Sequence, residues 1–195
     1  MNSKFDILKT GKRGTLIGSR RTVERIDNIA VKLGSALSDQ GVLSYSGGAP
    51  GMDSNFMLNY SPERRKIIIP SDNAFGMKHN GKDIIDFQTL DVMKAREIVE
   101  QVAGNFHSLE SGMQDLYSRN VVQVLGETLD NPTDFVLFWA PEQNFSVQGG
   151  TKIAVRVARM FNVPCFNLWR DDVLETVCKM FDIQTKRPNL DFLWK

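Results

Sequence analysis

The sequence has almost no net charge, since 24 Lys and Arg residues face 23 Asp and Glu residues for a formal charge of +1. A chain without a charge excess has no long-range field that would concentrate it on DNA or on an anionic membrane. It also has no apolar run long enough to span a bilayer, and runs such as Ile67 to Pro70 are typical of its longest. We therefore expect a cytoplasmic protein that does not bind membranes, and any affinity for nucleic acid has to come from a local site.

Cysteine and histidine are scarce as well. Cys165, in an expected strand, and Cys178, in an expected helix, lack both the CxxC spacing of a metal site and the density of a disulfide scaffold. We interpret both as reduced core residues. His79 and His107 are far apart in the sequence and have no second ligand at a metal-binding spacing. The sequence therefore predicts no metal site, and it indicates no cofactor.

The length of 195 residues suits a single domain, 1–195, with a core over about 14–168 and a C-terminal helix and tail over 169–195. Short apolar runs alternate with segments of helical period, which predicts an α/β fold: a Rossmann-like three-layer sandwich with a mostly parallel sheet of five or more strands.

The segment Ser71–Leu90 is polar without a steady period and is predicted to be a surface excursion. The apolar tail Phe192–Trp194 could dock on the body or on a partner. Strands are expected at 15–19, 42–45, 66–70, 134–139 and 163–168, and helices at 26–37, from 52, and at 91–102, 116–129, 151–158 and 171–181.

Three glycine-containing turns each follow a strand and open a helix: Gly18-Ser19-Arg20, Ser46-Gly47-Gly48-Ala49-Pro50-Gly51 and Gly149-Gly150-Thr151. In a parallel sheet, all three would lie at the same edge. One such turn is more often a tight bend than a site, but three at one edge favour phosphate binding, because glycine lets a backbone approach an anion and helix starts attract one. The first turn lacks the third glycine and the acidic residue of the dinucleotide fingerprint, so ordinary NAD binding is disfavoured.

Four motifs in chain order resemble a known family. They resemble the Rossmann core of the DNA-processing protein DprA and, more widely, the SLOG superfamily, which includes the "lonely guy" phosphoribohydrolases and nucleotide-sensing domains of bacterial defence systems. Small stand-alone members of this kind are familiar from tailed bacteriophages. The resemblance implies a pocket for phosphates or for a strand backbone, with Arg20, Asp53, Arg119 and Asn120 at its rim. The motifs are Ile17-Gly18-Ser19-Arg20, Ser46-Gly47-Gly48-Ala49-Pro50-Gly51-Met52-Asp53, Ser118-Arg119-Asn120 with Val122 and Leu125, and Gly149-Gly150-Thr151 with Ala154 and Ala158.

The sequence departs from the family pattern in three places. Met57 stands where DprA proteins carry a histidine, and no winged-helix domain follows Leu168. The phosphoribohydrolases place a catalytic Glu on the helix after the last glycine turn, whereas Thr151–Val157 contains no acid. N-glycosidic hydrolysis by the family mechanism, which needs that acid, is therefore in doubt.

Several residues leave alternatives open. Arg119 is expected to begin a helix and to face either solvent or the ligand, and arginine suits phosphate. Asp53 is either a site residue or a first-turn acid that complements the helix dipole. Trp139 could stack on a base, although packing is the commoner role. The basic residues Lys12, Arg13, Arg20, Arg21 and Arg25, like Arg64-Arg65-Lys66, are most simply solvated faces.

Three functions remain open. The leading hypothesis is a non-catalytic binder of a nucleotide or a nucleotide-derived ligand, which needs the turns but no acid–base pair. The second is a single-stranded-DNA mediator like DprA, which would need a basic groove and self-association into a homo-oligomer. The third is a nucleotide phosphoribohydrolase, or a related N-glycosyl enzyme, that uses an acid from elsewhere, such as Asp53 or Glu142. No catalytic residue is assigned. The predicted ligand-binding residues are Gly18, Ser19, Arg20, Ser46, Gly47, Gly48, Ala49, Gly51, Asp53, Arg119, Asn120, Gly149, Gly150 and Thr151.

Overall fold

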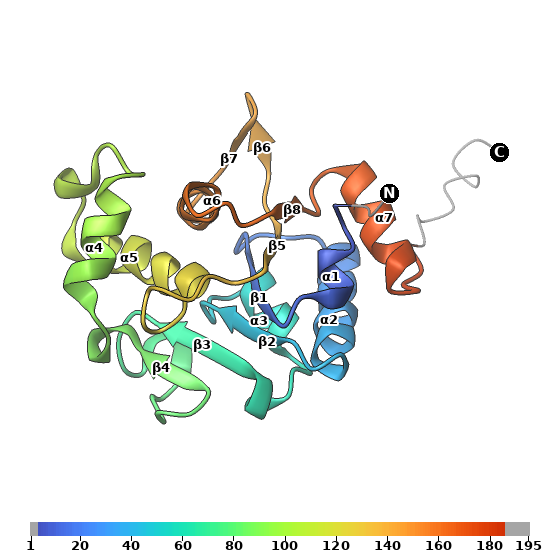
Figure 1. The fold of residues 1–195 in the computed structure, drawn as a ribbon, viewed down its shortest axis with the longest axis horizontal. Helices are drawn as coiled ribbons and strands as arrows, with labels where there is room; N and C mark the ends of the chain where they lie inside the picture. The colour runs from blue at the N-terminus through green and yellow to red at the C-terminus, as the bar shows by residue number, and fades with distance from the viewer. Residues whose placement is uncertain (1–3, 186–195) are drawn as a thin grey trace.

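The computed structural model describes residues 4–185, which form a six-stranded sheet with helices on both faces (Figure 1). The strand order is β4-β3-β2-β1-β5-β8, and every neighbouring pair is parallel. A separate antiparallel hairpin, β6 and β7, projects beyond this sheet. The predicted α/β class with a mostly parallel sheet is confirmed. The strands are β1 (Arg13–Gly18), β2 (Leu43–Ser46), β3 (Arg65–Ile69), β4 (Ile84–Asp86), β5 (Phe135–Trp139), β6 (Glu142–Gln143), β7 (Ser146–Val147) and β8 (Cys165–Asn167).

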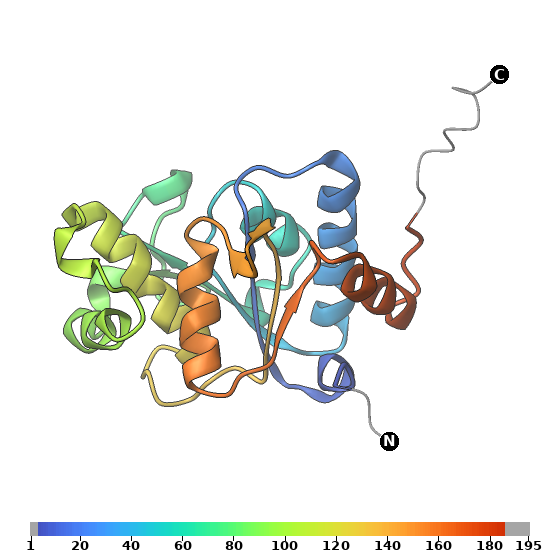
Figure 2. The same cartoon turned by 90° about the horizontal axis from the view of Figure 1, so that it is seen from above.

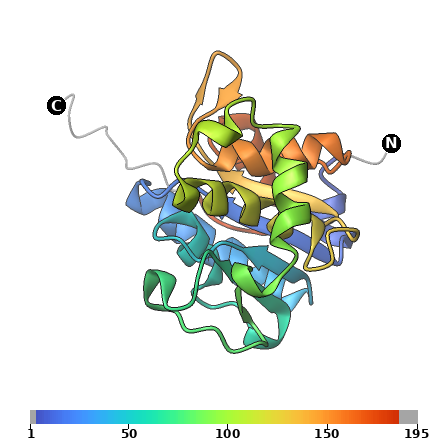
Figure 3. The ribbon, with the colours of Figure 1, turned by 90° about the vertical axis from the view of Figure 1, so that its left-hand side faces the viewer.

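Seven α-helices cover the sheet in the described part of the chain. α1, α2, α3 and α7 pack on one face, and α4, α5 and α6 pack on the other. In the latter layer α4 crosses α5 (Figure 3). The helices are α1 (Ile7–Thr10), α2 (Glu24–Asp39), α3 (Met52–Met57), α4 (Val92–Glu100), α5 (Ser111–Leu125), α6 (Thr151–Met160) and α7 (Asp171–Met180), with short 3₁₀ turns η1 (Pro62–Arg64), η2 (Ala74–Gly76), η3 (Phe87–Thr89) and η4 (Phe106–Ser108).

The central strand β5 divides its side chains between the two layers. Phe135, Leu137 and Trp139 join the core under α2 and α7, whereas Val136 and Phe138 join the core under α5 and α6. All five are buried because both faces of the sheet are covered, which explains why the strand is apolar throughout. The packing assigns Trp139 to the core, so the stacking alternative for this residue is wrong in the described structure.

Glycines allow two close approaches that shape the site edge. A Cβ on Gly34 in α2 would overlap the carbonyl oxygen of Phe56 in α3, so these helices meet backbone to backbone. A Cβ on Gly18 would lie 2.5 Å from the Trp139 carbonyl oxygen and 2.7 Å from the Met52 Cβ. The end of β1 is therefore held tightly between β5 and the start of α3.

Three expectations about elements need correction. The predicted excursion Ser71–Leu90 contains the edge strand β4, whose three residues are too few to show a period. The β6–β7 hairpin, with Asn144 and Phe145 at its tip, separates β5 from the third glycine turn, which therefore does not follow the strand directly. Helix α5 starts at Ser111 rather than at 116, which places Arg119 in mid-helix. The apolar tail Phe192–Trp194 lies outside the described residues.

The chain order changes direction at β1. After β1 the chain builds β2, β3 and β4 on one side, and it then crosses to place β5 and β8 on the other. In open α/β sheets, the crevice at such a switch lies at the carboxyl ends of the strands and is where ligands bind. Figure 2 shows α2 and α6 both beginning at this edge. Across residues 4–185, no helix has the length and apolar character of a membrane span.

Candidate functional site

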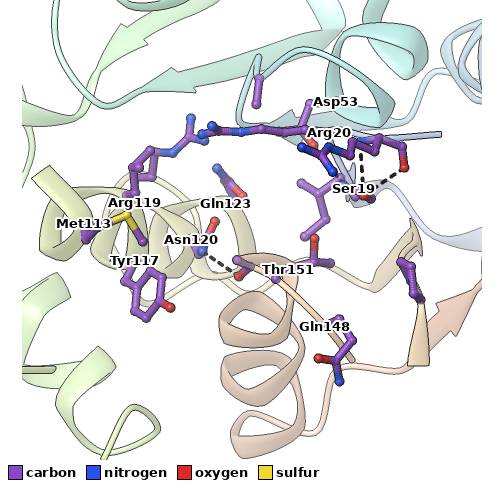
Figure 4. Close-up of a pocket in the computed structure, with 18 residues that line it drawn as sticks. Ser19, Arg20, Asp53, Met113, Tyr117, Arg119, Asn120, Gln123, Gln148 and Thr151 are labelled. Carbon is purple, nitrogen blue, oxygen red and sulfur yellow. Dashed lines mark hydrogen bonds between the residues drawn. The ribbon is translucent and has the colours of Figure 1, made fainter. Parts of the chain in front are cut away.

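A pocket of about 460 Å³ opens at the carboxyl ends of β1 and β5 (Figure 4). It brings together most of the predicted residues, but Ser46, Gly47, Gly48 and Gly51 do not line it. The lining residues are Ile17, Gly18, Ser19, Arg20, Arg21, Ala49, Asp53, Met113, Leu116, Tyr117, Arg119, Asn120, Gln123, Pro141, Gln148, Gly149, Gly150 and Thr151.

The first turn presents two exposed arginines. The Ser19 N–H donates to the Trp139 carbonyl over 2.9 Å, which fixes the turn to β5. The Ser19 hydroxyl donates to the Arg21 carbonyl and accepts from the Arg21 N–H at 3.0 and 3.2 Å. These hydrogen bonds hold the backbone of the turn, and the side chains of Arg20 and Arg21 are exposed. Neither arginine forms an ion pair within residues 4–185.

Asp53, on the first turn of α3, ties the first two turns together beneath the pocket. It is 5 % exposed, and its carboxylate accepts from the Gly18 N–H at 2.9 Å and the Gly47 N–H at 3.1 Å. Burial raises the pKa of Asp53, while Arg119 and the N–H donors of Gly18, Ala49 and Gly47 oppose that shift. Asp53 therefore lies in the floor, and its predicted place at the rim is wrong.

The second turn supports the pocket rather than lining it, apart from Ala49. Gly48 and Gly51 have φ values of +65° and +91°, which favour glycine. A Cβ on Gly51 would lie 2.6 Å from the Ser19 carbonyl oxygen, and one on Gly48 would lie 2.5 Å from the Met77 Cε. Ser46 is fully buried. These glycines let the second turn pass closely under the first.

Arg119 is a buried residue of α5 and not a rim residue. It is 5 % exposed, and its Nη1 donates to the carbonyl oxygens of Gly47 and Ile68, the latter at 2.7 Å. Burial lowers the pKa of Arg119 to about 10, Asp53 acts in the opposite direction, and Arg20 adds to the lowering. The guanidinium groups of Arg20 and Arg119 both lie near the Phe75 ring, at 5.8 and 5.5 Å from its centroid. Two cations therefore gather at one side of the pocket.

The third turn is open. Gly149 has a φ of +73°, Gly150 caps α6, and a Cβ on either glycine would meet nothing within 4 Å. The Asn120 amide donates to the Gly150 carbonyl at 3.3 Å, which anchors the turn to α5. The start of α6, where helix N–H groups favour anions, is thus accessible from the pocket.

Sequence reasoning missed one side of α5. Met113, Leu116, Tyr117 and Gln123 line the pocket along with Asn120. Their spacing of three or four residues places them on one helical face, but that pattern is equally typical of a core-facing stripe. Gln123 alone carries a signal, because it is a polar residue within the buried run from Val121 to Leu125.

Three of the other basic residues, Arg13, Arg64 and Arg65, have structural partners away from the pocket. Arg13 lies at the opposite end of β1, where it donates to the Asn131 carbonyl. Arg64 donates to the Gly41 carbonyl at the end of α2, and Arg65 forms an ion pair with Asp83. Glu142, a candidate acid, accepts from the Asn167 amide at 2.8 Å. No group of three or more His, Cys, Asp or Glu residues within residues 4–185 could hold a metal ion.

Comparisons with known proteins give one structural likeness. No family model matches the chain, and no curated protein matches it. The fold is similar to that of DNA processing protein A from Helicobacter pylori, with a TM-score of 0.51 and 16% sequence identity over 91% of this chain and 76% of that one. That protein is described as having a unique mode of single-stranded DNA binding. The likeness establishes a DprA-like fold.

Proposed function

We propose that this protein binds single-stranded DNA through the pocket at the carboxyl edge of the sheet. The main support is the charge of the pocket wall. Among the described residues, four charged side chains line the pocket, and three of them, Arg20, Arg21 and Arg119, are arginines, with Asp53 as the fourth. Asp53 already accepts backbone N–H groups and faces Arg119. The guanidinium groups of the two exposed arginines are therefore free to bind phosphate, to which a planar guanidinium can donate two parallel hydrogen bonds.

The start of α6 supports the same assignment. Gly150 offers no side chain to accept from the first N–H groups of this helix, and space around it is open. A phosphate at this position would complete the cap while Arg20 and Arg21 neutralise its charge. The DNA-binding description of the structural neighbour agrees with this chemistry.

A free nucleotide is the second candidate, because the size of the pocket suits a small ligand. Its volume of about 460 Å³ lies in the range of small-molecule sites. A mononucleotide and one nucleotide of a strand share the same phosphate and base chemistry. They differ in whether neighbouring phosphates add to the affinity and to its salt dependence.

The test is fluorescence anisotropy with labelled oligo(dT) over a series of salt concentrations. Replacing both Arg20 and Arg21 by Ala should weaken binding at least tenfold. The plot of the logarithm of the association constant against the logarithm of salt concentration should also become less steep by about 1.4, because each phosphate contact to a single strand contributes roughly 0.7 to its slope. The matched control replaces Lys94 and Arg159, which are exposed and do not line the pocket. That variant loses the same charge and should bind like the parent.

The same titrations separate the two candidates. Unlabelled deoxynucleoside monophosphates should displace the oligonucleotide only weakly if the strand is the ligand. Displacement at micromolar concentration, with oligonucleotide length making no difference, would favour the free nucleotide. A parental protein that binds neither class would show that the proposal is wrong.

A further inference from the structure

Gln123 carries a buried amide whose nitrogen lacks a partner among residues 4–185. Its side chain is 1 % exposed, and its Nε2 has no hydrogen-bond partner in the described structure. The residues around it on α5, from Val121 to Leu125, are buried, and the other four are Val or Leu. A buried donor without an acceptor costs stability, and an apolar residue of similar size would avoid that cost. An acceptor supplied by a ligand would give Gln123 Nε2 a partner and remove this cost.

The position of Gln123 is fixed by the fold. The Thr15 hydroxyl donates to the main-chain carbonyl oxygen of Gln123 at 2.7 Å, which holds this turn of α5 over β1. The amide reaches the pocket floor beside Gly47, where a Cβ would lie 2.6 Å from Asp53 Oδ2, 2.7 Å from Gln123 Nε2 and 2.9 Å from Arg119 Nη1. Figure 4 shows Gln123 among these pocket residues, on the side of α5 that carries Asn120.

The groups in the floor indicate what kind of acceptor fits. The Asp53 carboxylate would repel an anion that reached the floor. Arg119 could offset this charge, but its Nη1 already donates to two carbonyl oxygens. A neutral acceptor therefore suits this position better than a phosphate does, and the phosphate has its own place beside Arg20, Arg21 and Gly150.

The rest of the α5 wall suits a flat apolar ligand. Met113, Leu116 and Tyr117 line the pocket one to three turns before Gln123 on the same helix. Apolar and aromatic side chains pack against the faces of bases, and amide groups hydrogen-bond to their edges. We propose that Gln123 recognises a nucleobase in this pocket: its amide hydrogen-bonds to the edge of a base whose face lies against Tyr117.

This inference rests on the proposed function, and its test measures whether Gln123 is coupled to the base. Gln123→Leu and Gln123→Met are compared with the parent for binding to oligo(dT) and to an oligonucleotide of equal length built from abasic sites. Each variant should bind oligo(dT) roughly tenfold more weakly, as expected for one lost hydrogen bond, and should bind the abasic strand like the parent. Their melting temperatures should equal or exceed the parental value, because the unpartnered amide is gone.

Gln114→Leu is the matched control on the same helix. The Gln114 amide donates to the Leu109 carbonyl at 2.9 Å, and Gln114 does not line the pocket. Its replacement should lower the melting temperature and leave binding unchanged, which is the opposite pattern.

Two results would overturn the inference while the proposed function stands. Equal losses on the base-containing and abasic strands would mean that the amide contacts the backbone, and parental binding to both would mean that it contacts no ligand. If the parental protein instead binds mononucleotides, a deoxynucleoside monophosphate and 2-deoxyribose 5-phosphate form the equivalent pair. A parent that binds no nucleic acid and no nucleotide overturns the proposed function itself.

Discussion

At the scale of single residues, the contacts of Asp53 make it a structural tie within the site. Its carboxylate accepts from backbone groups of two different turns and faces a buried arginine. Removing it would leave these N–H donors without an acceptor and the buried Arg119 cation without a nearby opposite charge. We expect Asp53→Ala to lower the free energy of unfolding by about 3–5 kcal/mol, as measured by urea denaturation.

The same site offers a double variant as a control. Replacing Asp53 by Ala and Arg119 by Met removes two opposite charges that are buried and interact electrostatically, and removing both is less damaging than leaving one of them uncompensated. The double variant should therefore be more stable than Asp53→Ala alone. If the two losses simply add, the two side chains do not stabilise each other.

The sequence alone indicates that Asp53, Arg119 and Asn120 belong to one site, but it does not assign their roles. Asp53 and Arg119 are 66 positions apart, and α3 and α5 lie on opposite faces of the sheet. Only the fold shows that both side chains reach Gly47, where Asp53 accepts from the N–H and Arg119 donates to the carbonyl. The unpartnered state of Gln123 is equally invisible, because a polar residue in an apolar run can as well be satisfied by a neighbour.

At the scale of elements, the contact between α2 and α3 depends on one glycine. A Cβ at Gly34 would overlap the Phe56 carbonyl, and backbone atoms cannot move aside as a flexible side chain can. Gly34→Ala should therefore cost about 1–3 kcal/mol of stability despite the better helix propensity of Ala. Gly112, in the first turn of α5, has open space around it. Gly112→Ala should be neutral or stabilising. Thermal melting of the two variants and the parent measures both effects.

The start of α6 gives a test of phosphate binding that leaves the fold intact. Gly150 has a φ of −65°, so an L-residue is not strained there, and a Cβ would meet no atom within 4 Å. Gly150→Asp places a favourable charge at the helix cap but repels an incoming phosphate. Its melting temperature should match or exceed the parental value while oligonucleotide binding falls at least tenfold. Gly150→Ala, which adds no charge, should lose far less.

The elements that sequence patterns missed are the shortest ones. Strand β4 and the strands of the β6–β7 hairpin have three and two residues, too few for an alternation to be distinguished from loop sequence. The Asn144-Phe145 tip also lacks the glycine that marks most two-residue hairpins, although both residues have positive φ values. In contrast, β5 and α6 are long or apolar enough to be predicted from composition and period.

At the scale of the whole molecule, the fold controls the chemistry of its two cysteines. Burial raises the pKa of the Cys165 thiol to about 11 and also raises that of Cys178. Both thiols should therefore remain protonated at pH 8 and react slowly with a charged disulfide reagent in native buffer. In urea, two thiols per chain should react at once. Rapid stoichiometric labelling of the native protein would contradict this packing.

The tryptophan pair beside the first turn has a practical consequence. The indole rings of Trp139 and Trp169 lie 5.1 Å apart at 65°, and the Trp139 carbonyl accepts from the Ser19 N–H at the pocket edge. Two indoles this close couple their electronic transitions and give a circular dichroism signal that depends on their mutual orientation. A ligand that shifts the Ser19 turn would alter this orientation, so occupancy of the pocket can be followed optically in unlabelled protein.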